Sequence, residues 1–155
     1  MTDFRRGVRI GVDVGKARVG VARCDPDGML ATPVETVPRD DAAVARVLAI
    51  AAEQDAVAIV VGLPLNLRGE DTPSTADARA FAAALRAADL PVHMIDERLT
   101  TVSAHSQLRS VGRNQKQSRG IVDQVAAVVL LQQAIDIEKR TGNPAGEPVP
   151  PQEQV

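Results

Sequence analysis

The sequence predicts an α/β domain of three layers, in which a mixed five-stranded sheet carries helices on both faces. Its first forty residues alternate apolar and polar side chains, which predicts three consecutive antiparallel strands. Two later apolar segments each follow a helical pattern, which predicts parallel strands added to the same sheet. The predicted order is βββαβαβαα, and 155 residues suit one such domain.

The opening strands form a predicted meander. In VRIGVDV (8–14), valine and isoleucine alternate with Arg9, Gly11 and Asp13. A turn at Gly15 and Lys16 leads to a second strand, RVGVARC (18–24). The turn DPDG separates that strand from a third, LATPVETV (30–37).

The middle of the chain alternates helices and strands. Residues 40–54 have an apolar stripe at helical spacing, and Asp40 or Asp41 can cap this helix. AVAIVVG (56–62) is a continuous β-branched run, typical of a central strand buried on both faces. After the loop LPLNLRGEDTPST, a second helix is expected from Ser74 or Thr75 to about Ala88. PVHMID (91–96) is the fifth strand.

The last third is predicted to be helical, with one interruption. A helix begins near Thr100, the polar segment GRNQKQSRG (112–120) is a loop, and a final helix runs from about Ile121 to Arg140. The domain therefore spans residues 1–140. The tail, residues 141–155, contains four prolines and few apolar residues, so disorder is expected there.

Composition excludes several classes of function. No apolar run approaches the ~20 residues that cross a bilayer, and MTDFRRG lacks the apolar stretch of a secretory signal, so we expect a cytoplasmic protein without membrane contact. Cys24 is alone, which rules out an internal disulfide and a cysteine zinc site and favours a small buried side chain. Two Phe and no Trp or Tyr argue against binding single strands by aromatic stacking.

Positive charge is concentrated in one segment of an acidic chain. The net charge is −2, yet the segment from residue 98 to residue 122 holds five basic residues and no acid. These five are Arg98, Arg109, Arg113, Lys116 and Arg119. The distribution is typical of a local site for phosphates, although a solvated charged loop would look the same.

Asp13 is the first candidate for catalysis. It occupies a strand that is otherwise apolar, where an unpaired buried carboxylate would cost several kcal/mol. Either a salt bridge and backbone hydrogen bonds offset that cost, or the carboxylate binds a ligand. Gly11 and Gly20 would leave room for such a ligand, or they mark bulges and close helix packing.

Two other places in the chain carry acids that fit the same site. Asp96 and Glu97 end the fifth strand, where active sites of open α/β sheets collect. Because strand side chains alternate, only one of the two should face the site, and the pattern does not choose between them. Asp123 begins an apolar helical segment, where the helix dipole also favours an acid by ~0.3–1 kcal/mol.

Carboxylates without a His or Cys partner suit hard divalent cations. Mg²⁺ and Mn²⁺ prefer oxygen ligands, and they are often held by a few carboxylates together with substrate phosphate. One or two such ions can activate a water and stabilise the leaving oxygen of a phosphodiester. The acids therefore indicate a hydrolase that acts on phosphodiester bonds.

Four segments together resemble one known family. IGVDVGKARVGVA, VVGLPLNLRG, DERLTT and VDQVAAVVLL occur in this order between Arg9 and Gln133. They resemble the YqgF/RuvX family of RNase H-like nucleases, described as pre-16S rRNA processing nucleases and as Holliday-junction resolvase-like proteins. The resemblance implies an RNase H-like fold. It also implies that Asp13, Glu97 and Asp123 are the catalytic, metal-binding carboxylates, with Glu97 chosen over Asp96.

The resemblance extends to residues that would bind substrate. Asn66, Arg68 and Gly69 could meet the nucleic-acid backbone, although turn chemistry explains Asn66 and Gly69 equally well. Arg98, next to Glu97, could hold a phosphate. A basic loop carrying Arg113, Lys116 and Arg119 would clamp the backbone near the metal ions.

The resemblance implies a metal-dependent nuclease, with the 5′ end of pre-16S rRNA as the favoured substrate. The alternatives are a Holliday-junction resolvase that acts on branched DNA and a non-catalytic module that binds RNA or ribosome-assembly partners. DVGKARVG also resembles the phosphate motif of actin-like ATPases, but those need two such domains. A resolvase needs two active sites and favours a homodimer, whereas an RNA nuclease can be a monomer.

Overall fold

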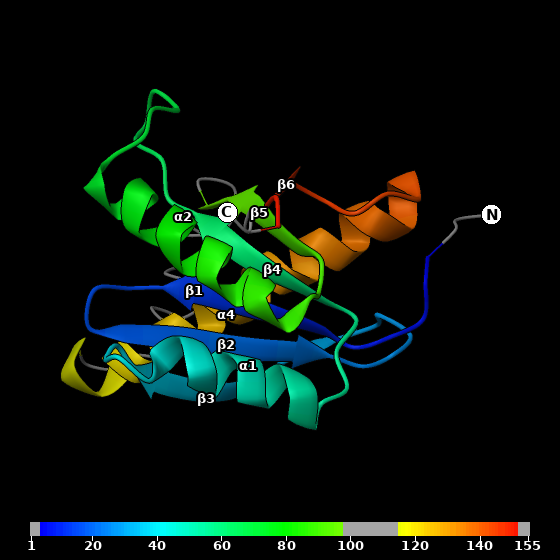
Figure 1. Ribbon diagram of the computed structural model, residues 1–155, viewed down its shortest axis with the longest axis horizontal. Helices are drawn as coiled ribbons and strands as arrows, with labels where there is room; N and C mark the ends of the chain where they lie inside the picture. Colours follow the sequence, from blue (N-terminus) through cyan, green and yellow to red (C-terminus); the bar gives the residue numbers. More distant parts are fainter. Residues whose placement is uncertain (1–3, 98–114, 152–155) are drawn as a thin grey trace.

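The computed structural model describes residues 4–97 and 115–151. It consists of one sheet with helices on both faces (Figure 1). The elements, in chain order, are β1 (Arg9–Val14), β2 (Arg18–Cys24), β3 (Ala31–Pro38), α1 (Ala43–Glu53), β4 (Ala58–Leu63), α2 (Pro73–Leu85), the 3₁₀ helix η1 (Arg86–Ala88), β5 (Val92–Asp96), α4 (Gln115–Thr141) and β6 (Glu147–Pro148). Within these residues, no helix combines the length and hydropathy that a bilayer crossing requires.

The sheet has the mixed topology that the sequence predicts. Its strand order is β3-β2-β1-β4-β5-β6. β1 pairs antiparallel with β2, and β2 with β3, which makes the expected meander. β4 pairs parallel with β1 and with β5. The parallel strands β1, β4 and β5 therefore end at the same edge of the sheet.

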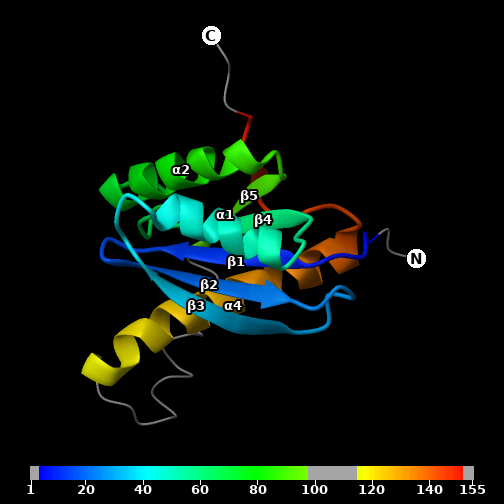
Figure 2. The same cartoon turned by 60° about the horizontal axis from the view of Figure 1, so that its bottom comes forward.

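The helices form two outer layers. α1 and α2 cover one face of the sheet and α4 covers the other (Figure 2). The alternation within β4 illustrates the division: Ile59 and Val61 belong to the core under α1 and α2, whereas Val60 belongs to the core under α4. This is why the central strand reads as a continuous apolar run.

Gly11 sets the distance between α4 and β1. A Cβ atom added at Gly11 would lie 2.7 Å from Leu131 Cβ and 2.9 Å from the Ala127 carbonyl oxygen. Only a residue without a side chain lets the helix approach this closely. The expectation that Gly11 leaves room for a ligand is therefore wrong, and its alternative, close helix packing, is correct.

Helix starts differ from expectation in two places. α1 begins at Ala43, and its N-cap, Ala42, has no side chain that could cap the helix. The Asp40 carboxylate accepts a hydrogen bond from the Ala42 N–H at 2.9 Å. α2 begins at Pro73 and is capped by Thr72, whose side chain and that of Thr75 bond each other's backbone N–H groups. This reciprocal cap fixes where the β4–α2 connection ends.

α4 begins earlier than predicted, and this corrects the expected basic loop. The segment from Gln115 to Gly120 is helical, so Lys116 and Arg119 belong to the helix. Gln, Lys and Arg are good helix formers, and one glycine costs only about 1 kcal/mol in a long helix. The helix expected near Thr100 and the remainder of that loop lie outside the described residues.

The start of the tail is ordered, contrary to expectation, and adds a sixth strand. β6 pairs antiparallel with β5, and the Val149 N–H donates to the Val92 carbonyl at 2.8 Å. Ala145 is buried in the core under α4. Without β6, β5 would present unpaired backbone groups at the sheet edge, and the tail satisfies them.

Candidate active site

Asp13 lies near the carboxyl end of β1, on the face of the sheet that α4 covers. It is two residues beyond Gly11, and strand alternation gives both residues the same face. Asp13 is half-buried and pairs across the antiparallel ladder with Gly20. The carboxylate therefore sits in the layer between β1 and α4, at the edge where the parallel strands end.

Arg39 fixes the turn that follows this strand. Its guanidinium donates two hydrogen bonds to the Asp77 carboxylate, both at 2.8 Å, and one to the Gly15 carbonyl at 3.0 Å. It also lies over the Phe81 ring, with 5.1 Å between Cζ and the ring centre. Arg39 thus ties the β1–β2 turn to α2, and the Arg39 hydrogen bonds lower the pKa of Asp77 below its ordinary value.

Glu97 reaches the same place from β5. It follows Ile95 by two residues, and Ile95 pairs with Gly62 in the middle strand, β4. A Cβ atom at Gly62 would lie 2.1 Å from Glu97 Oε1 and 2.8 Å from Glu97 Cδ. The carboxyl group therefore lies directly over Gly62. Because β4 lies between β1 and β5, this position brings Glu97 toward Asp13.

The two carboxyl groups interact directly. Burial, a side-chain hydrogen bond with Asp13, and the charges of Asp13 and Asp96 together raise the pKa of Glu97 from 4.5 to about 9. In the metal-free protein, the two carboxyl groups therefore share a proton at neutral pH. Two carboxyl groups held this close suit a hard divalent cation, which can replace the shared proton.

Asp96 faces the other way, as the alternation of the strand predicts. It pairs with Leu63, which belongs to the core under α1 and α2. Its charge still acts on Glu97, but its side chain starts from the opposite face of the sheet. The geometry therefore brings Glu97, and not Asp96, to Asp13.

Asp123 belongs to α4, one helical turn before Ala127. Ala127 is the residue whose carbonyl oxygen meets Gly11, and Asp13 is two residues beyond Gly11. Asp123 lies one helical turn from Ala127, and Asp13 lies two strand residues from Gly11, which is about 6 Å in each case. The backbone positions of Asp123 and Asp13 therefore both lie toward the edge where the parallel strands end. The side chain of Asp123 lies outside the described residues. Among the side chains that are described, no group of three or more His, Cys, Asp or Glu forms a metal cluster.

The structure describes some of the predicted substrate-binding residues and not others. The Asn66 side chain accepts hydrogen bonds from the backbone N–H groups of Arg68 and Glu70, both at 2.9 Å, which is the turn role weighed for it. Gly69 has a positive φ of 78°, so it too serves the turn. Arg68 is exposed beside them. Arg98 and Arg113 lie outside the described residues, as do the side chains of Lys116 and Arg119.

Gly62 is the residue of this site that the sequence analysis missed. The only signal in the sequence is a glycine within a strand of β-branched residues. That signal does not distinguish a site residue from a bulge or a packing position. The clash with Glu97 becomes visible only when the register between β4 and β5 is known.

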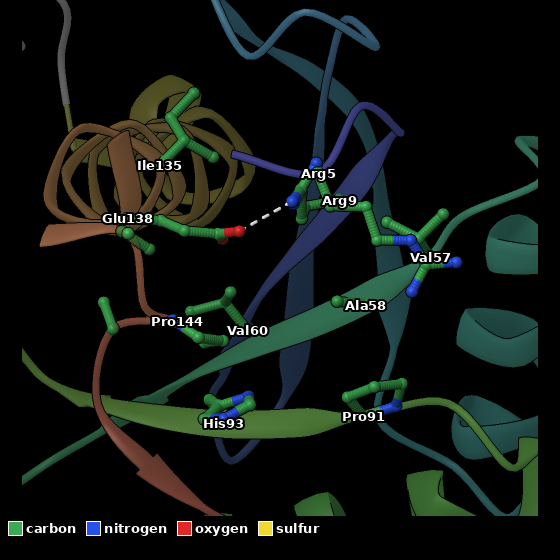
Figure 3. A pocket seen from close by; sticks show the side chains of 13 residues that line it. Arg5, Arg9, Val57, Ala58, Val60, Pro91, His93, Ile135, Glu138 and Pro144 are labelled. Carbon is green, nitrogen blue, oxygen red and sulfur yellow. Dashed lines mark hydrogen bonds and ion pairs between the residues drawn. The ribbon is translucent and has the colours of Figure 1, made fainter. Parts of the chain in front are cut away.

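A cavity of about 210 Å³ lies at the opposite end of the sheet (Figure 3). It is lined by residues at the starts of β1, β4 and β5, and the buried Arg9 guanidinium there bonds Glu138 of α4 at 2.7 Å. Cys24 is fully buried near this end, and its Sγ accepts a hydrogen bond from the Arg9 N–H. The cavity therefore lies where α4 packs against the start of the sheet, far from the carboxyl groups of Asp13 and Glu97.

The chain is similar in sequence to a known protein family and to named bacterial relatives. The profile of the family described as RuvX: Holliday junction resolvase matches residues 7–137. A protein of Clavibacter michiganensis subsp. michiganensis, named "Putative pre-16S rRNA nuclease", is 53% identical over 151 residues, which cover 95% of this chain and 94% of the relative. A protein with the same name from Streptomyces coelicolor is 50% identical over 150 residues, with 94% and 90% covered.

The fold of the chain is also similar to that of solved structures. The structure described as T. thermophilus RuvC in complex with Holliday junction substrate aligns with a TM-score of 0.55 at 18% identity, covering 90% of this chain and 99% of that chain. At this identity the likeness concerns the fold alone, and it confirms the RNase H-like class. The profile spans most of the chain and the relatives are about half identical, so the resemblance carried by the four motifs is confirmed: the chain belongs to the RuvX family.

Proposed function

We propose that this nuclease hydrolyses phosphodiester bonds near the 5′ end of pre-16S rRNA, using Mg²⁺ or Mn²⁺ held by Asp13, Glu97 and Asp123. The observation that carries the proposal is the contact of Asp13 and Glu97 above Gly62. Without a ligand, burying two acids side by side is unfavourable, and a divalent cation offsets that cost. The names of the relatives support pre-16S rRNA as the substrate.

The chain's own residues prepare the site for the cation. Gly62 leaves the space in which the Glu97 carboxyl lies, and Gly11 brings α4, with Asp123, close to β1. Glu97 would give up its proton on becoming a ligand. Both side chains would then be ionised carboxylates, whose oxygens can coordinate a cation. When bound, one or two divalent cations would supply activation of water and stabilisation of the leaving 3′-oxygen.

Phosphates of the substrate would meet the basic segment (98–122) and the β4–α2 connection. The residues proposed for these contacts are Arg68, Arg98, Arg113, Lys116 and Arg119. Asn66 would act by shaping the turn that presents Arg68, because its side-chain oxygen already accepts two backbone hydrogen bonds. Placing positive charge beside a carboxylate site draws a polyanion to the cleavage point.

A second substrate is favoured by the family description, which names Holliday junction resolvases. Cleavage of a junction requires an active site on each of two strands, so this alternative predicts a homodimer. A monomer suffices for trimming RNA. A cytoplasmic location fits both alternatives.

One comparison separates these alternatives. Purified protein is incubated with end-labelled pre-16S leader RNA and, in parallel, with a labelled four-way DNA junction, each with and without Mg²⁺. We expect metal-dependent cleavage of the RNA and little cleavage of the junction. The reverse preference, with sedimentation as a dimer, would establish the resolvase alternative. Salt-sensitive binding of either substrate without any turnover would contradict nuclease activity and leave the binding-module alternative.

A further inference from the structure

Leu67 is held almost completely in solvent. Its side chain is 96% exposed, at the tip of the connection between β4 and α2. The other large apolar side chains that are strongly exposed among the described residues are Met29 and Leu30, at 69% and 62% in the β2–β3 turn. Burying a leucine stabilises a folded protein, and this leucine contributes no such stabilisation.

The connection is built so that the leucine stays outside. Asn66 closes the turn through its side chain, its N–H donates to the Glu70 carbonyl at 3.1 Å, and its own carbonyl accepts from Gly69 at 2.9 Å. Below the turn, Leu65 and Asp71 form an antiparallel bridge. A turn with this many internal hydrogen bonds loses little conformational freedom when its tip meets a partner.

The hairpin leaves the sheet beside the paired carboxyl groups. β4 ends at Leu63, which pairs with Asp96, the residue before Glu97. Leu67 follows Leu63 by four positions, so the tip lies at most about 14 Å from the end of the strand. That reach equals about four base steps of 3.4 Å each. Figure 1 shows the hairpin projecting beyond the sheet next to the start of α2.

The chemistry around the tip fits a nucleic acid. Arg68 follows Leu67 and is exposed, so an apolar side chain stands next to a cation that can meet a phosphate. The two aromatic residues serve elsewhere: Phe81 is buried beneath Arg39, and Phe4 lies against Arg9 at the far end of the sheet. Proteins insert leucine as well as aromatic side chains between base steps to unstack them.

We propose that Leu67 is an apolar wedge that enters the base stack of structured nucleic acid close to the bond that is cut. The proposal rests on the proposed nuclease function and deepens it, since it assigns the hairpin Leu65–Asp71 to opening paired or stacked substrate. Arg68 holds the adjacent phosphate while Leu67 separates two bases. The chain thereby prefers substrates whose cleavage site lies next to a helix of nucleic acid.

The direct test measures base unstacking without cleavage. A leader RNA hairpin carrying 2-aminopurine beside the cleavage site is bound to the Asp13→Asn protein, and binding is followed separately by anisotropy. We expect fluorescence to rise by about twofold or more with Leu67 present, to fall back with Leu67→Ala, and to persist with Leu67→Met. Met29→Ala, a matched loss of an exposed apolar side chain at the opposite end, should change nothing.

Cleavage provides the second readout. In the otherwise unchanged nuclease, Leu67→Ala should slow cleavage of the hairpin by about tenfold and leave cleavage of an unpaired strand of the same sequence unchanged. The wedge proposal would be wrong if the wild-type nuclease and Leu67→Ala cleaved the hairpin at equal rates, or if the hairpin bound fully without a fluorescence change. Neither result would contradict the nuclease function. Absence of cleavage and binding by every protein would overturn the nuclease function itself. A change in self-association on Leu67→Ala would assign the leucine to contacts between copies of the chain, and would also overturn the wedge.

Discussion

The Glu97 carboxyl group lies directly over Gly62, on the neighbouring strand. A Cβ atom at Gly62 would come within 2.1 Å of Glu97 Oε1 and 2.8 Å of Glu97 Cγ. No real contact is this short, so any side chain at Gly62 must displace the carboxyl group. The glycine therefore positions Glu97 against Asp13, although it has no group that could bind a cation or a phosphate.

Gly62→Ala should reduce activity without unfolding the protein. Alanine suits a strand at least as well as glycine does, so the free energy of unfolding should change little once Glu97 moves aside. A catalytic group displaced by about 1 Å can cost about 100-fold in rate, and we expect a loss of this order. Cleavage rates and urea unfolding of the same preparations would measure both effects.

The double variant provides the control for that experiment. If Gly62 acts through Glu97, then Gly62→Ala should cost almost nothing further in a Glu97→Gln background. Additive losses in the two backgrounds would contradict the positioning role.

Without metal, the stability contributed by Glu97 should fall as pH rises. The pKa of Glu97 is about 9 in the folded protein, because of burial and the contact with Asp13, and about 4.5 when exposed. Between these values the folded state holds a proton that the unfolded state has released, so the free energy of unfolding decreases with increasing pH. The effect is absent below pH 4.5 and complete above about pH 9.

Chemical denaturation in EDTA from pH 5 to pH 9 would measure this dependence. The wild type should lose stability relative to Glu97→Gln across the range, since the amide cannot ionise. Comparing the two proteins cancels the contributions of groups common to both, such as His93. A difference that does not vary with pH would show that Glu97 is not held protonated by its surroundings.

Neutralising the basic segment should flatten the salt dependence of binding. Each lost phosphate contact removes about 0.9 from the slope of log K against log salt on duplex, and about 0.7 on a single strand. Changing Arg113, Lys116 and Arg119 to Gln should therefore lower the slope by about 2 to 3 in total. Arg6→Gln is the control, because Arg6 is paired with Asp27 at the far end of the sheet. An unchanged slope in the triple variant would exclude this segment from the interface.

The buried ion pair between Arg9 and Glu138 should matter far more for stability than an exposed pair. The two side chains are only 4% and 15% exposed, and their atoms are 2.7 Å apart. Glu138→Gln leaves the buried guanidinium without a counter-charge, which typically costs about 3–5 kcal/mol. Asp27→Asn breaks the exposed pair with Arg6 and should cost less than about 1 kcal/mol. Similar losses for the two variants would contradict this ranking.

Much of the sheet could be predicted because its signals are local. β2 has the predicted bounds, and the alternation in β1 and the apolar run of β4 define strands without knowledge of their neighbours. β6 could not be predicted, since it is two exposed residues recruited by the backbone of β5. The start of α4 was wrong because polar residues between glycines are compatible with both a loop and a helix.

The site was only partly accessible from sequence. Alternation shows that Asp96 and Glu97 diverge, but which of them meets Asp13 depends on the register of β5 against β4. Similarly, apolar residues fall on more than one side of α4 between Val122 and Ile137, and the sequence does not show that Ala127, Leu131 and Ala134 join Leu130 among the buried ones. Interactions between strands and layers decide both cases, and they follow from the folded chain.

Manganese binding shows whether Asp13 and Glu97 hold a divalent cation together. In metal-scrubbed buffer, Mn²⁺ is titrated into the wild type and into Asp13→Asn and Glu97→Gln, with binding followed by electron paramagnetic resonance and the site located by anomalous diffraction. We expect Mn²⁺ between Asp13 and Glu97 in the wild type, and loss of that site in both variants while their folds remain intact. Manganese bound elsewhere, or bound equally well by all three proteins, would show that Asp13 and Glu97 do not form the metal site.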